Sequence, residues 1–271
     1  MLEIPCLICG AGAVKNAWEP VLDALGGELL GSRMTGDQAN FQFAQLVYLL
    51  RWYSLSGEFG RDGLETSKAT LNSIRKAVAK ELSIAQQEGR ISARPDLTNI
   101  LEQFIPDMSG SLIYVSTNWD TTGDEVILQY YSALNPHQKF HLNPVHLHGS
   151  TSDPNTLYLP TEMTKEPYRS EEEEQAIGSI HGALMKGLET STRSILYGIS
   201  LSPLDAELCT TLIAGWNNPV LQEIIVVNPH HEQVAKRVLA MLRNPERVKV
   251  SAFHPERLDE EIVYWKGSDS A

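Results

Sequence analysis

Short apolar runs that end in glycine or polar residues alternate along the chain with stretches of helical spacing. The apolar runs cover residues 4–9, 112–115, 145–147, 195–197, 223–227 and 248–252. Runs of this length, bounded by turn residues, are typical of buried strands. We therefore expect about six strands, the first of which enters a tight glycine turn.

Helical spacing fills most of the intervals between these runs. The expected helices cover residues 19–25, 37–55, 64–88, 97–104, 124–134, 175–188, 205–216 and 230–242. Within 64–88, Leu71, Ile74, Val78 and Leu82 recur at steps of three and four, which is the pattern of an amphipathic helix. A strand followed by a helix, repeated about five times, predicts right-handed crossovers and a parallel sheet.

The predicted fold is α/β, with a Rossmann-like parallel sheet of about six strands and helices on both faces, in a single domain spanning residues 1–271. Residues 15–110, after the first strand, are expected to form a mostly helical insertion. Its apolar residues Phe41, Phe43, Leu46, Leu49 and Leu50 predict core positions, with an assembly contact as the alternative. Residues 151–172 predict a long polar loop, and the acidic run at 171–174 predicts a solvated surface segment.

Charge narrows the classes of partner. The 271 residues include 22 Lys and Arg against 34 Asp and Glu, which gives a formal charge of −12. That balance argues against a general nucleic-acid or anionic-membrane binder, because phosphates would be repelled. No run approaches the roughly 18 apolar residues of a membrane helix. The N-terminus lacks the basic region of a signal peptide, so a cytoplasmic location is expected.

Three cysteines, Cys6, Cys9 and Cys209, are one too few for a four-cysteine zinc module. Their odd number also argues against a disulfide framework. Cys6 and Cys9 form a C-x-x-C inside an apolar run, which predicts small buried thiols rather than a redox pair.

Glycine and polar residues gather where five of the predicted strands end, at residues 10–12, 116–120, 148–150, 198–202 and 228–229. Parallel sheets bind ligands beyond the carboxyl ends of their strands. The turn Gly10-Ala11-Gly12 suits a dinucleotide, because glycines let the backbone approach a pyrophosphate and a following helix offers its amides. Lys15 stands where the G-x-G-x-x-G fingerprint has its last glycine, so a plain tight turn is the alternative.

Two further strand ends carry candidate chemistry. The string STNWD at 116–120 predicts either a site or a helix N-cap, with Asp120 capping the helix at 124–134. His146 lies within the apolar run and predicts a hydrogen-bonded core histidine. His148 stands at the end of that run beside a glycine. Because an imidazole titrates near neutrality, this position predicts a general base. No third ligand of recognisable spacing accompanies the two histidines, which disfavours a metal pair.

Taken in order, five strings resemble the sirtuin-like family, and especially its bacterial NAD-hydrolase branch. They are CLICGAGA, YVSTNWD, VHLHGS, LYGISLS and IIVVNP. The resemblance covers residues 1–14 and 110–252 and implies that NAD is the substrate, bound without a metal. It implies that Asn118 lies beside the nicotinamide ribose and orients the nucleophile, and that His148 is the catalytic base.

The resemblance also implies which residues hold the rest of NAD. Gly10, Ala11 and Gly12 are similar to the turn that cradles the phosphates, and Asp120 to the acidic partner that shapes the loop at 116–120. Thr117 in the same loop is also expected to bind NAD. Gly198 and Ser200 are similar to the pair on the adenosine side. Asn228 is similar to the residue that holds the adenosine ribose.

The function implied is an NAD glycohydrolase that yields nicotinamide and ADP-ribose, in bacterial antiphage defence by NAD depletion. Breaking the nicotinamide–ribose bond passes through an oxocarbenium-like centre with a neutral leaving group. It needs positioning, a polar residue for the nucleophile, and a base. Asn118 and His148 supply these without a metal.

Two alternatives stay open. Protein-deacylating sirtuins resemble each other in a four-cysteine zinc module and in a string of the kind SGIPDFR after the glycine turn, and this chain has neither. Protein deacylation or ADP-ribosyl transfer is therefore the enzymatic alternative, and water is the favoured acceptor. The other is a non-catalytic subunit that binds NAD or ADP-ribose and acts through a partner. The resemblance further implies a homo-oligomer or an activating protein partner.

Overall fold

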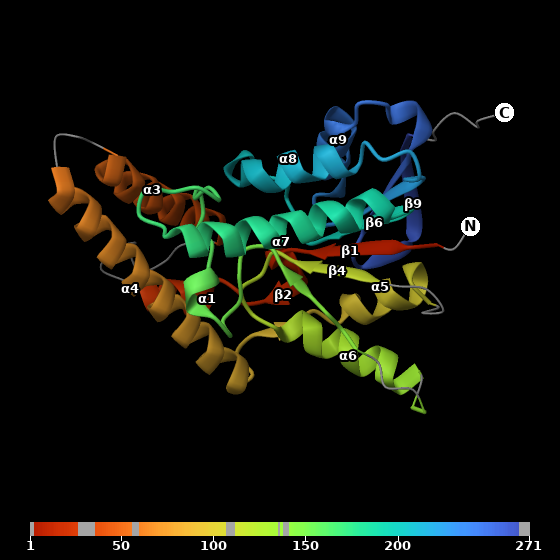
Figure 1. Cartoon of the computed structure of the whole chain (residues 1–271). Helices are drawn as coiled ribbons and strands as arrows, with labels where there is room; N and C mark the ends of the chain where they lie inside the picture. Colours follow the sequence, from red (N-terminus) through yellow and green to blue (C-terminus); the bar gives the residue numbers. More distant parts are fainter. Residues whose placement is uncertain are drawn as a thin grey trace.

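Seven strands form the main sheet of the computed structural model, which describes residues 3–26, 36–55, 60–106, 112–134, 136–137 and 141–265 (Figure 1). The strands are β1 (Pro5–Cys9), β4 (Ile113–Ser116), β5 (Val145–His146), β6 (Arg193–Tyr197), β7 (Glu223–Val227), β8 (Lys249–His254) and β9 (Arg257–Trp265). The first six pair in parallel, and β9 runs antiparallel to β8. The predicted α/β class and parallel sheet are confirmed.

The strand order, β5-β4-β1-β6-β7-β8-β9, reverses at β1. The chain first builds outward from β1 to β4 and β5, and it then returns to place β6 on the other side of β1. Such a reversal opens a crevice at the carboxyl ends of the two strands, where open α/β sheets bind their ligands. Cys9 pairs with Tyr197 in the last register position of β1 and β6, so the turns that follow both strands start side by side.

The sequence prediction missed β9. This strand carries Asp259, Glu260 and Glu261 in a row, and most of its side chains are exposed. The acidic residues precede a short apolar run at 262–265, so the strand shows no clear alternation of apolar and polar residues along its length. Charges of this kind are usual on an edge strand, because they discourage pairing with another chain.

Five helices cover the two faces of the sheet (Figure 1). On one face lie α7 (Glu171–Thr190), α8 (Ala206–Gly215) and α9 (His231–Met241), and on the other lie α5 (Asp96–Phe104) and α6 (Thr122–Leu134). Side chains alternate along β1, so that Cys6 and Ile8 join the first core and Leu7 and Cys9 join the second. Burial raises the pKa of the Cys6 thiol to about 12, and both thiols are buried as predicted.

The helices α1 (Glu19–Leu25), α3 (Gly36–Leu55) and α4 (Gly60–Gln87) lie beyond one end of the sheet and share a third core (Figure 1). In contrast, α5 packs on the sheet itself. The short strands β2 (Val14–Lys15) and β3 (Ser92–Ala93) pair beside the glycine turn. Residues 27–35, 56–59 and 107–110 of the expected insertion lie outside the described residues. Within the described ranges, none of the helices has the length and apolar character that a membrane span requires.

Two surface expectations differ from the structure. Phe41 and Leu49 are 56% and 45% exposed, so the core prediction is wrong for them, although Phe43 is buried. The loop predicted over 151–172 ends earlier, because the acidic run at 171–174, which lies at the surface as predicted, forms the first turn of α7. Ser170 and Glu173 form a capping box there, and the acidic side chains meet the positive end of the helix dipole.

Candidate functional site

A cleft of about 790 Å³ opens at the carboxyl ends of the parallel strands. All ten residues singled out from the sequence line it, namely Gly10, Ala11, Gly12, Thr117, Asn118, Asp120, His148, Gly198, Ser200 and Asn228. They follow β1, β4, β5, β6 and β7, so the parallel sheet gathers residues more than 200 positions apart in the chain. The volume lies within the range of about 300–1,000 Å³ that is usual for small-molecule sites.

The turn after β1 and the turn after β6 pack backbone against backbone. The amide of Gly10 donates to the carbonyl of Tyr197 at 2.9 Å, and the amide of Gly12 donates to that of Gly198 at 3.0 Å. A Cβ on Gly12 would lie 2.9 Å from the Cα of Gly198, which itself has a φ of +66°. This contact between turns explains why the positions hold glycine.

The helix that follows the glycine turn spans Glu19–Leu25 as predicted, but it does not begin at the turn. A three-residue 3-10 turn, η1 (Ala11–Ala13), follows instead, then β2, and the next helix begins only at Glu19. The amide of Ala13 donates to the carbonyl of Gly10 at 2.8 Å. The amides of Gly10, Gly12 and Ala13 all donate within the protein. They are therefore not free to bind an anion as the amides at the start of a helix would be.

Asn118 is held in the cleft by its backbone. Its amide donates to Ser116 Oγ at 3.1 Å, and its carbonyl accepts from His146 Nδ1 at 3.3 Å. The other ring nitrogen of His146 lies 2.8 Å from Asp124 Oδ2, so His146 is hydrogen-bonded as predicted. The side-chain amide of Asn118 has no hydrogen-bond partner among the described residues, which leaves it available to a ligand.

His148 is fixed on three sides. Its Nδ1 lies 3.1 Å from the carbonyl of Thr117 and must carry the proton of that bond, because a carbonyl only accepts. Its Nε2 lies 3.4 Å from Asp205 Oδ1. The ring stacks on that of Tyr158, with centroids 5.6 Å apart and planes 15° apart. The imidazole therefore has one orientation in the cleft.

The surroundings of His148 favour its charged form. Burial alone would lower the pKa of this imidazole, but the Asp205 carboxylate, the Thr117 carbonyl and Glu207 raise it above the ordinary value of 6.5. Asp205 ends the short turn η3 (Pro203–Asp205) between β6 and α8. The sequence analysis missed Asp205, and the signal that would have found it is an acidic residue close behind the polar turn after β6.

Residues 158–162 line one side of the cleft, and we call the segment 157–169 that contains them the wall segment. Tyr158 Oη donates to the Glu207 carboxylate, which also accepts from the amide and the hydroxyl of Thr164 at 3.1 and 3.0 Å. These bonds join the wall segment to α8. They also hold the Tyr158 ring against the ring of His148.

Buried charges join the wall segment to the helices of the third core. Glu162 accepts from Arg75 on α4, from Arg169 at 2.7 Å and from the hydroxyl of Tyr168 at 2.8 Å. Arg51 on α3 lies 2.7 Å from Glu166. Because the wall segment is held from both α3 and α4, these helices help to fix the shape of the cleft.

Asp120 and Asn228 hold backbone turns. Asp120 Oδ1 accepts from the amide and hydroxyl of Thr122 at 3.0 and 2.6 Å, so this carboxylate bonds the start of α6, which begins at Thr122 rather than at residue 124. Asn228 Nδ2 donates to the carbonyl of Ile199 at 3.0 Å, and its Oδ1 accepts from the amide of His230 at 2.8 Å. Asn228 therefore reaches the cleft with both side-chain polar atoms bonded, and Asp120 with its Oδ1 bonded.

Arg94 is the one Lys or Arg among the described residues that line the cleft, beside the acids Glu19, Asp120, Glu162, Asp205 and Glu207. Its amide donates to the carbonyl of Ala13 at 2.9 Å, which places it directly next to the glycine turn. The sequence analysis missed this residue, because the pairing of β2 with β3 brings it to the turn from 80 positions away. Arg94 is the natural partner for an anionic ligand here.

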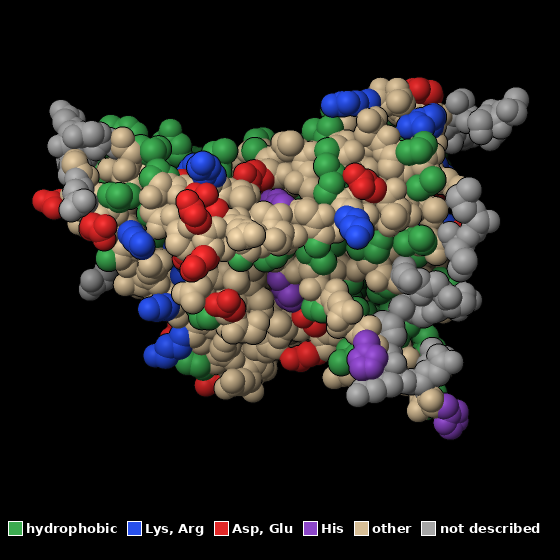
Figure 2. Space-filling model, viewed as in Figure 1, with side chains coloured by type: hydrophobic (Ala, Val, Ile, Leu, Met, Phe, Trp, Pro, Cys, Tyr) green, Lys and Arg blue, Asp and Glu red, His purple; other side chains and the backbone are tan. Residues whose placement is uncertain are grey.

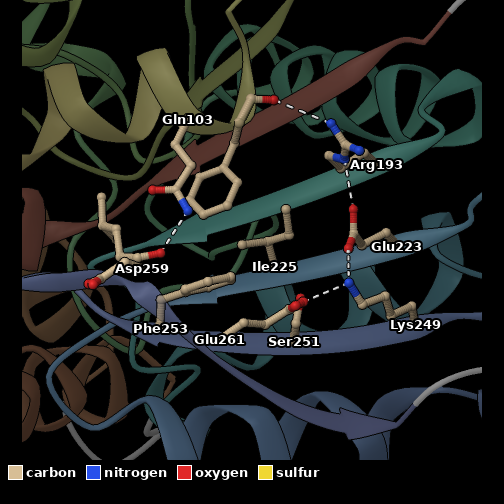
Figure 3. A pocket seen from close by; sticks show the side chains of 11 residues that line it. Gln103, Arg193, Glu223, Ile225, Lys249, Ser251, Phe253, Asp259 and Glu261 are labelled. Atoms are coloured by element: carbon tan, nitrogen blue, oxygen red, sulfur yellow. Dashed lines mark hydrogen bonds and ion pairs between the residues drawn. The ribbon is translucent and has the colours of Figure 1, made fainter.

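A second hollow, of about 370 Å³, lies at the amino ends of β6, β7 and β8 (Figure 3). Its charged residues form a chain in which Arg193 pairs with Glu223 at 2.9 Å, and Lys249 pairs with Glu223 and Glu261 at 3.1 and 2.6 Å. Its cations are therefore already neutralised. It also lies at the opposite end of the strands from the cleft, so the chemistry of the candidate site belongs to the cleft alone.

Within the described ranges, no group of three or more His, Cys, Asp or Glu side chains is arranged to hold a metal ion. The chain matches none of the protein-family models and none of the curated proteins with which it was compared. The function is therefore argued from the geometry of the cleft.

Proposed function

We propose that this chain is a sirtuin-like NAD glycohydrolase, which cleaves NAD to nicotinamide and ADP-ribose. One observation carries the proposal. The free amide of Asn118 and the Asp205-paired imidazole of His148 line a single cleft at the switch point of a Rossmann-like sheet, next to the glycine turn of β1. Each of the five strings that resemble the sirtuin-like family contributes residues to the lining of this cleft.

The reaction needs only groups that these residues supply. The bond between C1′ of the ribose and the pyridinium nitrogen breaks, and its electron pair neutralises the nicotinamide as it leaves. The oxygen of a water molecule bonds to C1′, and the proton of that water passes to Nε2 of a neutral His148. Asn118 orients the water through its side-chain amide, and Thr117 fixes the tautomer that leaves Nε2 to accept.

Charge favours NAD binding in one orientation. The diphosphate lies against Arg94 at the glycine turn, because Arg94 is the one Lys or Arg in the described lining and the carboxylates there would repel a phosphate. The nicotinamide ribose then lies toward Asn118 and His148. Depletion of cytoplasmic NAD in antiphage defence is the cellular role that accompanies this activity.

A non-catalytic role in NAD or ADP-ribose binding is the second candidate, and one observation favours it. The raised pKa of His148 keeps part of the imidazole protonated at neutral pH, and a protonated imidazole accepts no proton. Protein deacylation is disfavoured, because Cys6 and Cys9 are both buried in β1, where they cannot ligate a structural zinc ion.

The test is nicotinamide release from NAD by the purified chain at pH 8, where His148 is more often neutral than at pH 7. We expect His148→Ala and Asn118→Ala each to lower kcat by at least about 100-fold, the contribution of a general base or a positioning group. The control is His254→Ala, because His254 lies on β8 and does not line the cleft. Full activity of His148→Ala would refute the mechanism, and ADP-ribose binding without turnover would establish the second candidate.

A further inference from the structure

Tyr158 belongs to the wall segment, and its backbone bonds to the two turns that carry the candidate reacting groups. Its amide donates to the carbonyl of His148 at 2.8 Å, and its carbonyl accepts from Trp119 Nε1 at 3.3 Å. Trp119 directly follows Asn118 in the chain. Tyr158 therefore connects the turn of Asn118 with the turn of His148, although it has no step of its own in the proposed reaction.

The hydrogen bonds of His148 leave one motion of its ring open. The contacts at Nδ1 and Nε2, to Thr117 and Asp205, lie at the edge of the imidazole. The torsion that turns a histidine ring has broad minima, so edge contacts alone let the ring tilt until Nδ1 leaves its carbonyl. The ring of Tyr158 lies against the face of the imidazole, with planes only 15° apart, and this contact blocks the tilt.

The Tyr158 ring is itself held from two further directions. Its hydroxyl donates to the Glu207 carboxylate on α8, and the guanidinium carbon of Arg169 lies 5.5 Å from the ring centroid. A guanidinium within about 6 Å of an aromatic ring is attracted by the negative face of that ring. Arg169 is held in turn by Glu162 at 2.7 Å. The imidazole of His148 thus stacks on a ring that is anchored at its hydroxyl and at its face.

The backbone beside this contact is closely packed. Gly149, which follows His148, has a φ of +77°, and a Cβ there would lie 2.2 Å from the carbonyl oxygen of Thr156. In the middle of the face that Figure 2 shows, histidine side chains are visible only in small recessed areas. The side chain of His148 is 17% exposed. A displacement of Tyr158 is therefore transmitted to His148 through both the backbone and the ring.

We propose that Tyr158 is a positioning residue that acts through His148. Its ring keeps the imidazole in the plane in which Nδ1 donates to Thr117, so that the proton stays on Nδ1 and Nε2 is the nitrogen that accepts. The effect of Tyr158 on catalysis rests on the proposed hydrolysis of NAD. Its effect on the imidazole does not, and it is measured separately.

The first test uses two substitutions that separate the ring from the hydroxyl. Tyr158→Leu removes the stack, whereas Tyr158→Phe keeps the stack and loses the bond to Glu207. We expect Tyr158→Leu to lower kcat for NAD by about 10-fold or more with KM changed by less than about 3-fold, because a misplaced reacting group costs rate rather than affinity. Tyr158→Phe should restore most of this loss. The control is Tyr131→Leu, because Tyr131 is a buried tyrosine on α6 that does not line the cleft.

The second test needs no turnover. Nitrogen chemical shifts in NMR report which ring nitrogen of His148 carries the proton, at a pH above the midpoint of its titration. We expect one form, with the proton on Nδ1, in the wild type and in Tyr158→Phe, and a mixture of both neutral forms in Tyr158→Leu. If the wild type releases no nicotinamide, the proposed function fails, and this measurement alone decides the role of Tyr158.

Circular dichroism and thermal melts establish that the variants are folded, and Tyr158→Met, which also lacks a ring, takes the place of Tyr158→Leu if that variant does not fold. A folded variant without the ring that keeps the proton on Nδ1 alone overturns the proposal. In an active enzyme, so does an unchanged kcat, a KM that rises as much as kcat falls, or an equal loss of kcat in Tyr131→Leu.

Discussion

Replacing Asp205 by Asn removes the carboxylate that lies 3.4 Å from Nε2 of His148 while it keeps the size of the side chain. At this distance, the attraction between unit charges is about 1 kcal/mol in water and about 5 kcal/mol at an effective dielectric constant of 20. Both side chains are partly buried, so the value lies between these limits. Because this attraction favours the charged imidazole, we expect Asp205→Asn to lower the pKa of His148.

Two assays measure this shift independently. The first follows the ring protons of His148 by NMR as a function of pH, and it needs no catalytic activity. The second follows kcat/KM for NAD, which should rise with pH through the pKa of His148, because only the neutral imidazole accepts a proton. In Asp205→Asn this rise should move to lower pH, and the plateau at high pH should fall because the remaining imidazole is a weaker base.

Other groups beside His148 also affect its pKa. Glu207 raises the pKa of His148 further, whereas His181 opposes its charge, and Tyr158 presents an uncharged ring. The matched control is Asp124→Asn, because Asp124 pairs with His146 at 2.8 Å and should move the pKa of His146 instead. An unchanged pKa of His148 in Asp205→Asn would refute the reasoning.

The same shift has a consequence for stability. A histidine whose folded pKa is raised stabilises the fold fully below its unfolded pKa of about 6.5, and this contribution is lost as the pH rises through the folded value. The difference in unfolding free energy between the wild type and Asp205→Asn should therefore be larger at pH 6 than at pH 9. Urea denaturation at the two pH values measures it.

Three further changes test the cleft and its walls. Arg94→Gln should raise KM for NAD about 10-fold with little change in kcat, because a charge-assisted contact worth about 1.5 kcal/mol or more is lost. The control in the same steady-state assay is Arg90→Gln, because Arg90 pairs with Glu88 on the surface. Gly198→Ala should lower the unfolding free energy by about 2 kcal/mol or more, since φ is +66° and the added Cβ would lie 2.4 Å from the amide nitrogen of Ala13. An unchanged midpoint of urea denaturation would contradict the close packing of the two turns. Glu162→Gln should cost about 3–5 kcal/mol in the same measurement, because Arg75 and Arg169 lose their buried counter-charge, whereas Glu256→Gln on the exposed turn after β8 should cost little.

Local patterning was enough to predict the sheet and the helices on it, because its strands are buried on both faces and end in glycine or polar turns. The residues gathered in the cleft followed from the parallel topology, which brings all carboxyl ends to one edge. Asn118 and His148 lie there for that reason. The edge strand β9 was not predictable in this way, because its acidic residues hide the strand period.

Contacts between segments that are distant in the sequence account for the remaining differences between the predicted and the observed structure. Arg94 reaches the glycine turn only through the pairing of β2 with β3, and Tyr158 reaches His148 only because Glu207 holds its hydroxyl. Neither contact leaves a periodic signal in the sequence. The exposure of Phe41 and Leu49 likewise depends on how α3 is rotated against α4. The order of apolar residues along α3 does not reveal this rotation.

The wall segment 157–169 has a consequence for how the cleft exchanges its contents with solvent. Loops of this length usually open more readily than the helices and strands they connect. Here, opening would separate Glu162 from Arg75 in a buried pair and remove Tyr158 from Glu207. The segment should therefore exchange its amide hydrogens more slowly than an unanchored loop, and this side of the cleft should stay closed while small molecules enter and leave.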